Sequence, residues 1–184
     1  INLNDEIHNL IEFEKDQARQ GKEARIILKL NNLQDYDIIQ LLYDASDAGV
    51  KIHLIVRGIC CAIAGKRGMS ANISGMAIID RYLEHSRVYY FFHGGTEKVF
   101  LSSADWMARN LHFRIEMAFP VYQQRLKQII IDNIDYQLRD NVKSRDLDHK
   151  CYNQYRRDEH KKKFQSQIEM HRYFRDLNRD WLQQ

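Results

Sequence analysis

The sequence is poor in the residues that crosslink or kink a chain. It has one proline and three cysteines in 184 residues, and the cysteines are Cys60, Cys61 and Cys151. Adjacent cysteines rarely pair with each other, and no CxxC spacing is present. We therefore expect free thiols that pack as small buried hydrophobic residues in the reducing cytoplasm, and we expect no zinc site.

The sequence also lacks the segments that direct a chain to a membrane. No apolar run approaches the roughly 18 residues that a membrane-spanning helix needs, and no signal pattern opens the chain. The chain begins at Ile1 rather than at Met, so we expect a piece of a longer protein, with a processed chain as the alternative. We expect a cytoplasmic location, and the sequence leaves open a peripheral association with a membrane.

Several common catalytic motifs are missing. The chain contains no HExxH motif, no cluster of Cys and His, no acidic pair at metal-ligand spacing and no GxxxxGK[ST] loop. These absences exclude a P-loop mechanism and indicate that no metal ligands can be identified in this chain.

Positive charge is concentrated near the end of the chain. The formal net charge is +3; residues 1–140 contain 17 Lys and Arg against 18 Asp and Glu, and residues 141–184 contain 11 against 7. A positive site in the body of the chain must therefore be local. The charge of the whole chain is weak evidence for a nucleic-acid partner, and we expect no specific one.

Hydrophobic periodicity predicts alternating helices and strands. An amphipathic helix is predicted over residues 4–20, and strands over 24–30 and 50–56 flank a helix that opens at residue 34 or 35. Short connections make this a parallel strand–helix–strand unit. Further along, we predict a loop over 58–75, an undecided helix or strand over 73–83, strands over 88–92, 98–101 and 114–121, and a helix over 123–140.

These patterns predict the α/β class, with a layered sheet and flanking helices. Length and composition suit one domain with an appended tail. We place the domain at residues 1–140 and a basic, helical C-terminal extension at residues 141–184.

Arginine and histidine gather at the predicted strand ends. Arg57 follows the strand over 50–56, and His85 stands between Arg81 and Arg87 just before another strand. Guanidinium groups match phosphate oxygens, and histidine can carry a proton near neutral pH. Ligands of open α/β sheets bind at the carboxyl ends of strands. The pattern predicts a phosphate site; the alternatives are a surface arginine paired with a carboxylate and a structural histidine.

A second candidate segment leaves the strand over 98–101. Ser103 offers a hydroxyl group and backbone donors there, whereas the alternative is a simple helix cap formed by Asp105. His93, followed by two glycines, is interpreted as a turn residue.

Five blocks of sequence, in order, resemble the C-terminal domain of bacterial polyphosphate kinase, the histidine-phosphorylating class. The resemblance runs from about Ile7 to Leu147, and the tail beyond it matches the family poorly. Its specific stretches are Ile27–Leu33, Gly49–Ile52, Ile55–Cys61, Tyr82–Arg87 and Ser103–Met107.

The resemblance implies a fold and an activity. The fold would be that of phospholipase D. The family moves the terminal phosphate of ATP reversibly onto inorganic polyphosphate, through a phosphohistidine and with Mg²⁺. The phosphorylated histidine would belong to an upstream domain of the same polypeptide, so this fragment alone should be inactive. The full-length protein is expected to form a homo-oligomer.

The resemblance also implies residue roles. His85 would be catalytic, and Arg57 and His85 would contact the phosphates of ATP or ADP. Arg81, Arg87 and Ser103 would be neighbours that shape the same tunnel.

One departure separates the chain from phospholipase D hydrolases, which use His-x-Lys, four residues and then Asp. Here Arg87 stands at the lysine position and Phe92 at the acid position. The loss of the acid argues against a phosphodiesterase built from two His85 sites. Another alternative is a non-catalytic binding or assembly module for polyanions, supported by the basic run over 155–163; a solvated helix face is the simpler interpretation of that run.

Overall fold

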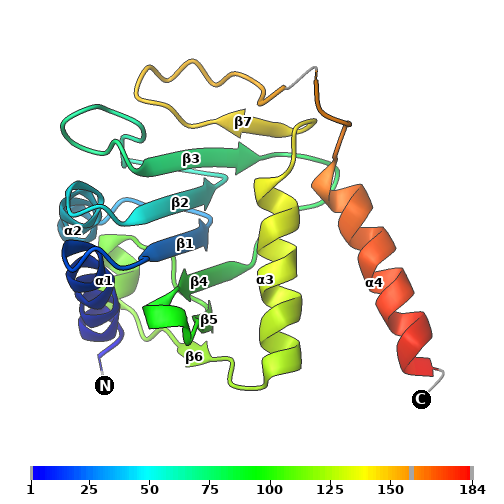
Figure 1. The fold of residues 1–184 in the computed structure, drawn as a ribbon, viewed down its shortest axis with the longest axis horizontal. Coiled ribbons are helices and arrows are strands. Elements are labelled where there is room, and N and C mark those ends of the chain that lie inside the picture. Colours follow the sequence, from blue (N-terminus) through cyan, green and yellow to red (C-terminus); the bar gives the residue numbers. More distant parts are fainter. Residues whose placement is uncertain (1, 158–159, 183–184) are drawn as a thin grey trace.

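The computed structural model describes residues 2–157 and 160–182, and a mixed sheet lies at its centre (Figure 1). Its strands are β1 (Arg25–Leu30), β2 (Lys51–Val56), β3 (Ile73–Ile78), β4 (Arg87–Phe91), β5 (Lys98–Ser102), β6 (Ala118–Pro120) and β7 (Ser144–Asp146). They lie in the order β6-β5-β4-β1-β2-β3-β7. The three central pairings, β1 with β2 and β2 with β3 in parallel and β1 with β4 in antiparallel orientation, place β1 where the strand direction reverses.

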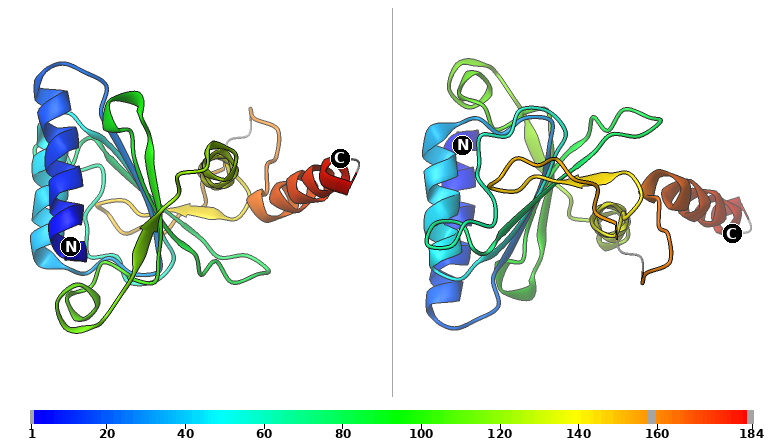
Figure 2. Two further views of the ribbon diagram at one scale, coloured as in Figure 1. Left: turned by 90° about the horizontal axis from the view of Figure 1, so that it is seen from below. Right: turned by 90° about the horizontal axis from the view of Figure 1, so that it is seen from above.

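Helices cover both faces of this sheet. Helices α1 (Leu3–Arg19) and α2 (Tyr36–Asp47) lie on one face, and α3 (Gln124–Leu138) lies on the other (Figure 2). Helix α4 (Ser166–Leu182) packs on α3 and projects away from the sheet. The α/β class and the layered arrangement are as predicted.

Alternate side chains of β1 enter two different cores. Ile26 and Leu28 join the larger cluster with α1 and α2, whereas Ile27 joins a smaller cluster with Ile134 of α3. A strand covered on both faces needs apolar residues at successive positions. This requirement explains the run of Ile and Leu in β1.

Most of the predicted elements are confirmed, the undecided segment is resolved, and one strand needs correction. The parallel unit of β1, α2 and β2 is present, and the Asp35 side chain caps α2 by accepting a hydrogen bond from the Ile38 N–H. The undecided segment over 73–83 contains a strand, β3. The strand expected over 114–121 was wrong in length, because only residues 118–120 pair with β5.

The cysteine prediction is only partly correct. All three thiols are free, but Cys61 and Cys151 are exposed. Cys60 alone is half-buried, and burial raises the pKa of its thiol to about 11.

The segment after α3 returns to the sheet. Strand β7 pairs with β3 and adds the seventh strand, so residues beyond 140 contribute to the same sheet. The division into a domain and an extension at residue 140 stays a prediction. The expectation that the extension is helical holds only for α4, because the described residues of 141–165 form β7 and irregular segments. In the described part of the chain, no helix combines the length and the apolar character needed to cross a membrane.

One buried carboxylate holds the chain in place where it returns to the sheet after α3. Asp140 is 2% exposed and accepts hydrogen bonds from the N–H groups of Val142, Lys143 and Ser144, and from the N–H and hydroxyl of Ser166. Burial acts to raise the pKa of Asp140, but these hydrogen bonds outweigh it and lower the pKa. The carboxylate therefore joins the end of α3 to β7 and to the start of α4.

We predict that Asp140→Asn lowers the free energy of unfolding by about 1.5–3 kcal/mol, because hydrogen bonds to an ionised acceptor are lost inside the protein. Urea denaturation measures this change. Asp135→Asn, at an exposed carboxylate of α3, is the control and should cost less than about 1 kcal/mol.

The loss of stability caused by Asp140→Asn should depend on pH in a defined direction. Because the folded pKa of Asp140 lies below its ordinary value, the carboxylate stabilises fully above about pH 4 and loses this effect as the pH falls through the folded pKa. The difference in unfolding free energy between the wild type and Asp140→Asn should therefore shrink in acid. A difference independent of pH would contradict the assignment.

Candidate phosphate-binding site

The reversal of strand direction at β1 brings four chain segments together. The ends of the parallel strands β1 and β2 lie at one edge, and β4 starts there because it runs antiparallel to β1. The end of β5 joins them, since Arg87 of β4 pairs with Ser102. Residues that follow β1, β2 and β5, or that lead into β4, therefore meet in space.

Asp105 connects these segments. It is 4% exposed; its Oδ1 accepts from the Asn31 N–H at 2.8 Å, and its Oδ2 accepts from Asn32 Nδ2 at 3.0 Å. Arg87 donates to both oxygens, from Nε at 3.1 Å and from Nη2 at 3.3 Å. Burial acts to raise the pKa of Asp105, but these donors outweigh it and lower the pKa. An ionised Asp105 thus orients Arg87 as a bidentate partner.

The alternative that Asp105 caps a helix is therefore wrong. The next helical segment is a short π-helical turn over Arg109–Phe113, and no side chain caps it. The carboxylate contacts residues that follow β1, and does not contact the helical turn that follows it in the sequence.

His85 lies between two guanidinium groups. Arg57 Nη2 lies 3.0 Å from His85 Nδ1, and Arg87 Nη1 lies 3.4 Å from His85 Nε2. Arg57 is held in place by Asn31, whose side-chain oxygen accepts from Arg57 Nε at 2.6 Å. His85 itself is exposed, so a ligand can reach the ring.

This arrangement has an excess of donors. Guanidinium groups donate and cannot accept, so a neutral His85 can accept from only one of the two arginines, and Nδ1, facing Arg57, makes the shorter contact. The ring hydrogen then sits on Nε2, opposite an N–H group of Arg87. Two N–H groups that face each other repel, whereas an anionic oxygen to one side of the pair can accept from both. The geometry favours an anion such as phosphate.

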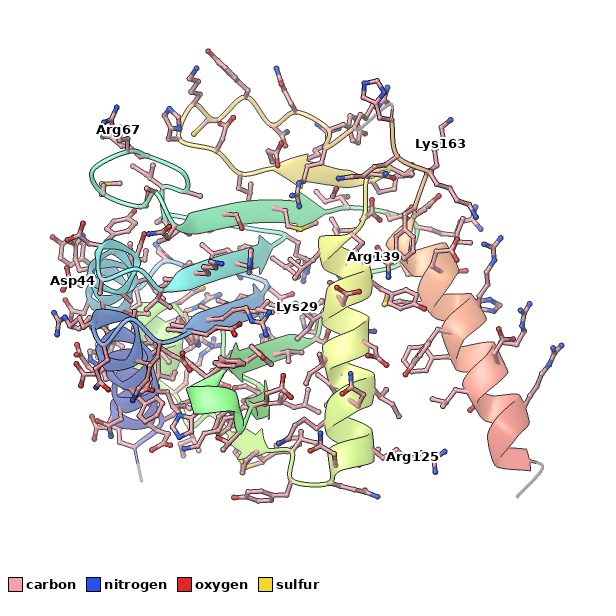
Figure 3. All side chains as sticks on the ribbon, viewed as in Figure 1. Lys29, Asp44, Arg67, Arg125, Arg139 and Lys163 are labelled. Carbon is pink, nitrogen blue, oxygen red and sulfur yellow. The ribbon has the colours of Figure 1, made fainter. Side chains whose placement is uncertain are left out.

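A buried lysine contacts the residues on either side of His85 in the sequence. Lys29 of β1 is 2% exposed and lies on the side of the sheet that faces α3 (Figure 3). Its Nζ lies 3.1 Å from Glu84 Oε2 and 3.4 Å from the Ser86 carbonyl oxygen. Burial lowers the pKa of Lys29, Arg57 and Arg87 lower it further, and Glu84 opposes the shift.

The segment before His85 has no regular secondary structure and is held by the C-terminal part of the chain. Gln167 of α4 accepts from the Tyr82 N–H at 3.0 Å and donates to the Tyr82 carbonyl at 2.8 Å and to Glu84 at 2.9 Å. Just before α4, Gln165 donates to Asp80 at 2.6 Å. Lys29 and α4 therefore both hold residues that neighbour His85 in the sequence.

The structure joins only some of the predicted site residues. Arg57, His85 and Arg87 come together, and among the described residues Arg57 has no carboxylate partner, in contrast to the surface-arginine alternative. Arg81 contributes its N–H to Asp80, and its guanidinium makes no hydrogen bond or ion pair in the described part of the chain. The Ser103 hydroxyl donates to Glu116 and accepts from the Met117 N–H, so its contacts lie on another segment.

Several supporting residues were missed by sequence reasoning. Asn31 and Asn32 follow a strand end as Arg57 does, and this shared position was the available signal. Lys29 could have been noticed as a charge within an apolar strand. Gln167 gives no local signal, because its partners are more than 80 residues away. Within residues 2–157 and 160–182, no group of three His, Cys, Asp or Glu side chains could hold a metal ion.

Comparison with known proteins identifies the family. The family described as "Polyphosphate kinase C-terminal domain 2" matches residues 1–167. The chain belongs to this family. Polyphosphate kinase of Escherichia coli (strain K12) is 44% identical over 171 residues, which cover 93% of this chain and 25% of that protein. The chain therefore spans about a quarter of the length of the curated relatives it matches.

Solved structures agree with the polyphosphate kinase fold. The crystal structure of polyphosphate kinase from Porphyromonas gingivalis matches 98% of this chain and 28% of that one, with a TM-score of 0.95 and 44% identity. Nuc from Salmonella typhimurium, a phospholipase D family member, matches 73% of this chain and 88% of that one, with a TM-score of 0.50 and 14% identity. The second match concerns the fold alone and confirms the phospholipase D-like prediction.

The family match corrects the extent of the resemblance. Sequence reasoning ended it near Leu147 and judged the tail a poor match, whereas the family match continues to residue 167. The continuation includes the start of α4 and Gln167, the residue that contacts the segment before His85.

We predict that Gly58→Ala destabilises the polyphosphate kinase domain by about 1–3 kcal/mol through overpacking. A Cβ atom at Gly58 would lie 2.6 Å from Asn32 Oδ1 and 2.8 Å from the Asn31 carbonyl oxygen, and the backbone atom cannot easily move. The measurement is the free energy of unfolding in urea.

Gly65→Ala is the matched control, because nothing lies within 4 Å of its added Cβ and only the positive φ of 70° opposes it. That control should cost about 1 kcal/mol. An unchanged free energy of unfolding in Gly58→Ala would show that the close approach at Gly58 has no energetic effect.

Proposed function

We propose that this chain is the C-terminal catalytic domain of a polyphosphate kinase that transfers the terminal phosphate of ATP reversibly to inorganic polyphosphate. The observation that carries the proposal is the donor excess around His85. Two guanidinium groups and an imidazole N–H converge there, and their charge and spacing suit the oxygens of a phosphoryl group.

Phosphoryl transfer depends mainly on positioning and on the stabilisation of charge. Arg57 would hold phosphate oxygens of ATP or ADP, and Arg87, oriented by Asp105, would contact the same group. His85 would donate from Nε2 to an oxygen on which charge develops as the bond between the β and γ phosphates breaks. The γ phosphorus would bond to a histidine in an upstream domain, and this phosphohistidine would then pass the group to polyphosphate.

The family implies Mg²⁺ with the nucleotide, but the residues of this site do not suit a magnesium ion. Lys29, Arg57 and Arg87 are cations, and Asp105 already accepts four hydrogen bonds. Magnesium prefers carboxylate, phosphate and water oxygens. We therefore assign no magnesium ligand to these residues.

We predict that His85→Ala and Arg57→Ala each lower polyphosphate synthesis by about 10²–10³-fold in the full-length enzyme, because a contact to the transition state is lost. Synthesis from ATP is measured as labelled polymer. Arg19→Ala, which removes an exposed arginine of α1, should leave the rate near that of the wild type. Normal synthesis by either site variant would refute the role assignments.

We predict that residues 1–184 alone neither make polyphosphate nor retain phosphate from ATP. The phospho-accepting histidine would lie in another part of the enzyme. Incubation with γ-labelled ATP, followed by acid treatment, measures both products. Stable, acid-labile label on His85 would contradict this division of roles.

A further inference from the structure

A cleft of about 840 Å³ lies away from the His85 site, between the end of α3, β7 and the segment that leads into α4. A solvated helix face was the simpler interpretation of the basic run over 155–163, but the described residues of this run form no helix. Six cationic side chains line the cleft: Arg139, Arg156, Arg157, Lys161, Lys162 and Lys163.

The carboxylates of the cleft are already engaged. Asp140 receives the five hydrogen bonds described above, Asp146 pairs with Arg156 at 3.0 Å, and Glu169 pairs with Arg172 at 2.7 Å. Within the described part of the chain, Lys162 and Lys163 are exposed and have no carboxylate partner. The cleft therefore keeps a local excess of positive charge.

The backbone that carries these lysines is fixed. Asn141 accepts from the Phe164 N–H at 2.7 Å, donates its own N–H to the Phe164 carbonyl at 3.0 Å, and donates from Nδ2 to the Lys162 carbonyl at 3.1 Å. The Arg139 guanidinium lies 4.4 Å from the centre of the Phe164 ring. Figure 3 shows Arg139 at the end of α3 and Lys163 on the segment before α4. An anion would meet a preorganised surface, which lowers the ordering cost of binding.

We propose that this cleft binds a run of inorganic polyphosphate outside the nucleotide site. The inference rests on the proposed function, which supplies a linear polyanion to the same polypeptide. Lys162 and Lys163 precede Gln165 and Gln167 by only a few residues, and those glutamines contact the segment that carries His85. Polyphosphate held in the cleft would thus lie on the chain segment that also supports the catalytic histidine.

Polyphosphate fits the cleft better than a nucleic acid does. Proteins that bind single-stranded nucleic acids stack bases on aromatic rings. Here Tyr155 has the guanidinium groups of Arg145 and Arg157 at 4.1 and 5.1 Å from its ring centre, and Phe164 is covered by Arg139. These rings are engaged by cations, whereas charged phosphate oxygens need no ring.

The test compares three double variants of the full-length enzyme. Lys162→Gln with Lys163→Gln should weaken the binding of long-chain polyphosphate about tenfold at low salt and reduce the salt dependence of binding, since fewer phosphates are neutralised. It should also shorten the polymer made, with the KM for ATP unchanged. Lys22→Gln with Lys51→Gln is the control, because it removes the same charge from exposed residues near the amino ends of β1 and β2. Lys162→Arg with Lys163→Arg should restore binding.

Each outcome has one meaning. A wild-type enzyme that makes no polyphosphate would overturn the proposed function. An active wild type, with a Lys162 and Lys163 variant that matches the control in affinity, salt dependence and product length, would overturn the cleft alone. Tighter binding of a single-stranded RNA that depends on both lysines, and that polyphosphate does not displace, would overturn it in favour of a nucleic-acid site.

Discussion

The ion pair between Asp105 and Arg87 is the interaction on which the site depends. It joins the segment after β5 to the start of β4, and the two remaining hydrogen bonds of Asp105 reach Asn31 and Asn32 after β1. Asn31 in turn accepts from Arg57. Removal of this one buried carboxylate would leave Arg87 without its partner and would free the asparagine that positions Arg57. The orientation of both arginines therefore depends on a residue that need not contact a ligand.

Charge balance explains how so many cations remain close together. Lys29, Arg57 and Arg87 are accompanied by two carboxylates, Glu84 and Asp105. The site thus keeps one uncompensated positive charge, and the electrostatic cost of that excess falls when an anion binds. Because the donors are already oriented by neighbouring groups, little reorganisation would accompany the binding of an anion.

Sequence reasoning succeeded where the signal was local. Periodicity defined β1, α2 and β2, and Arg57 and His85 stood at strand ends where ligands bind. It failed where partners are distant in sequence. The role of Asp105 requires knowledge that the segment after β5 lies beside the segment after β1, and a helix cap was the natural local alternative. Arg81 flanks His85 in sequence just as Arg87 does, but only Arg87 belongs to a strand whose pairing turns it toward the ring.

The importance of α4 was hidden for the same reason. Composition marked residues 141–184 as a basic extension, and the charge of the tail drew attention away from its neutral residues. Gln167 is uncharged and buried within the contact it makes. The link between this helix and His85 is visible only once the chain has folded.

The site also depends on residues that never approach a ligand. In β4, Tyr89 and Phe91 face the larger core while Val88 and Tyr90 face the smaller one, and Arg87 shares the alternation of Tyr89 and Phe91. A slip of one residue in the pairing of β4 would exchange the two faces. Arg87 would then point through the sheet, away from Asp105, although every site residue was still present in the chain. Burial of the aromatic rings of β4 thus fixes the register of the strand, and the register sets the direction of the Arg87 side chain.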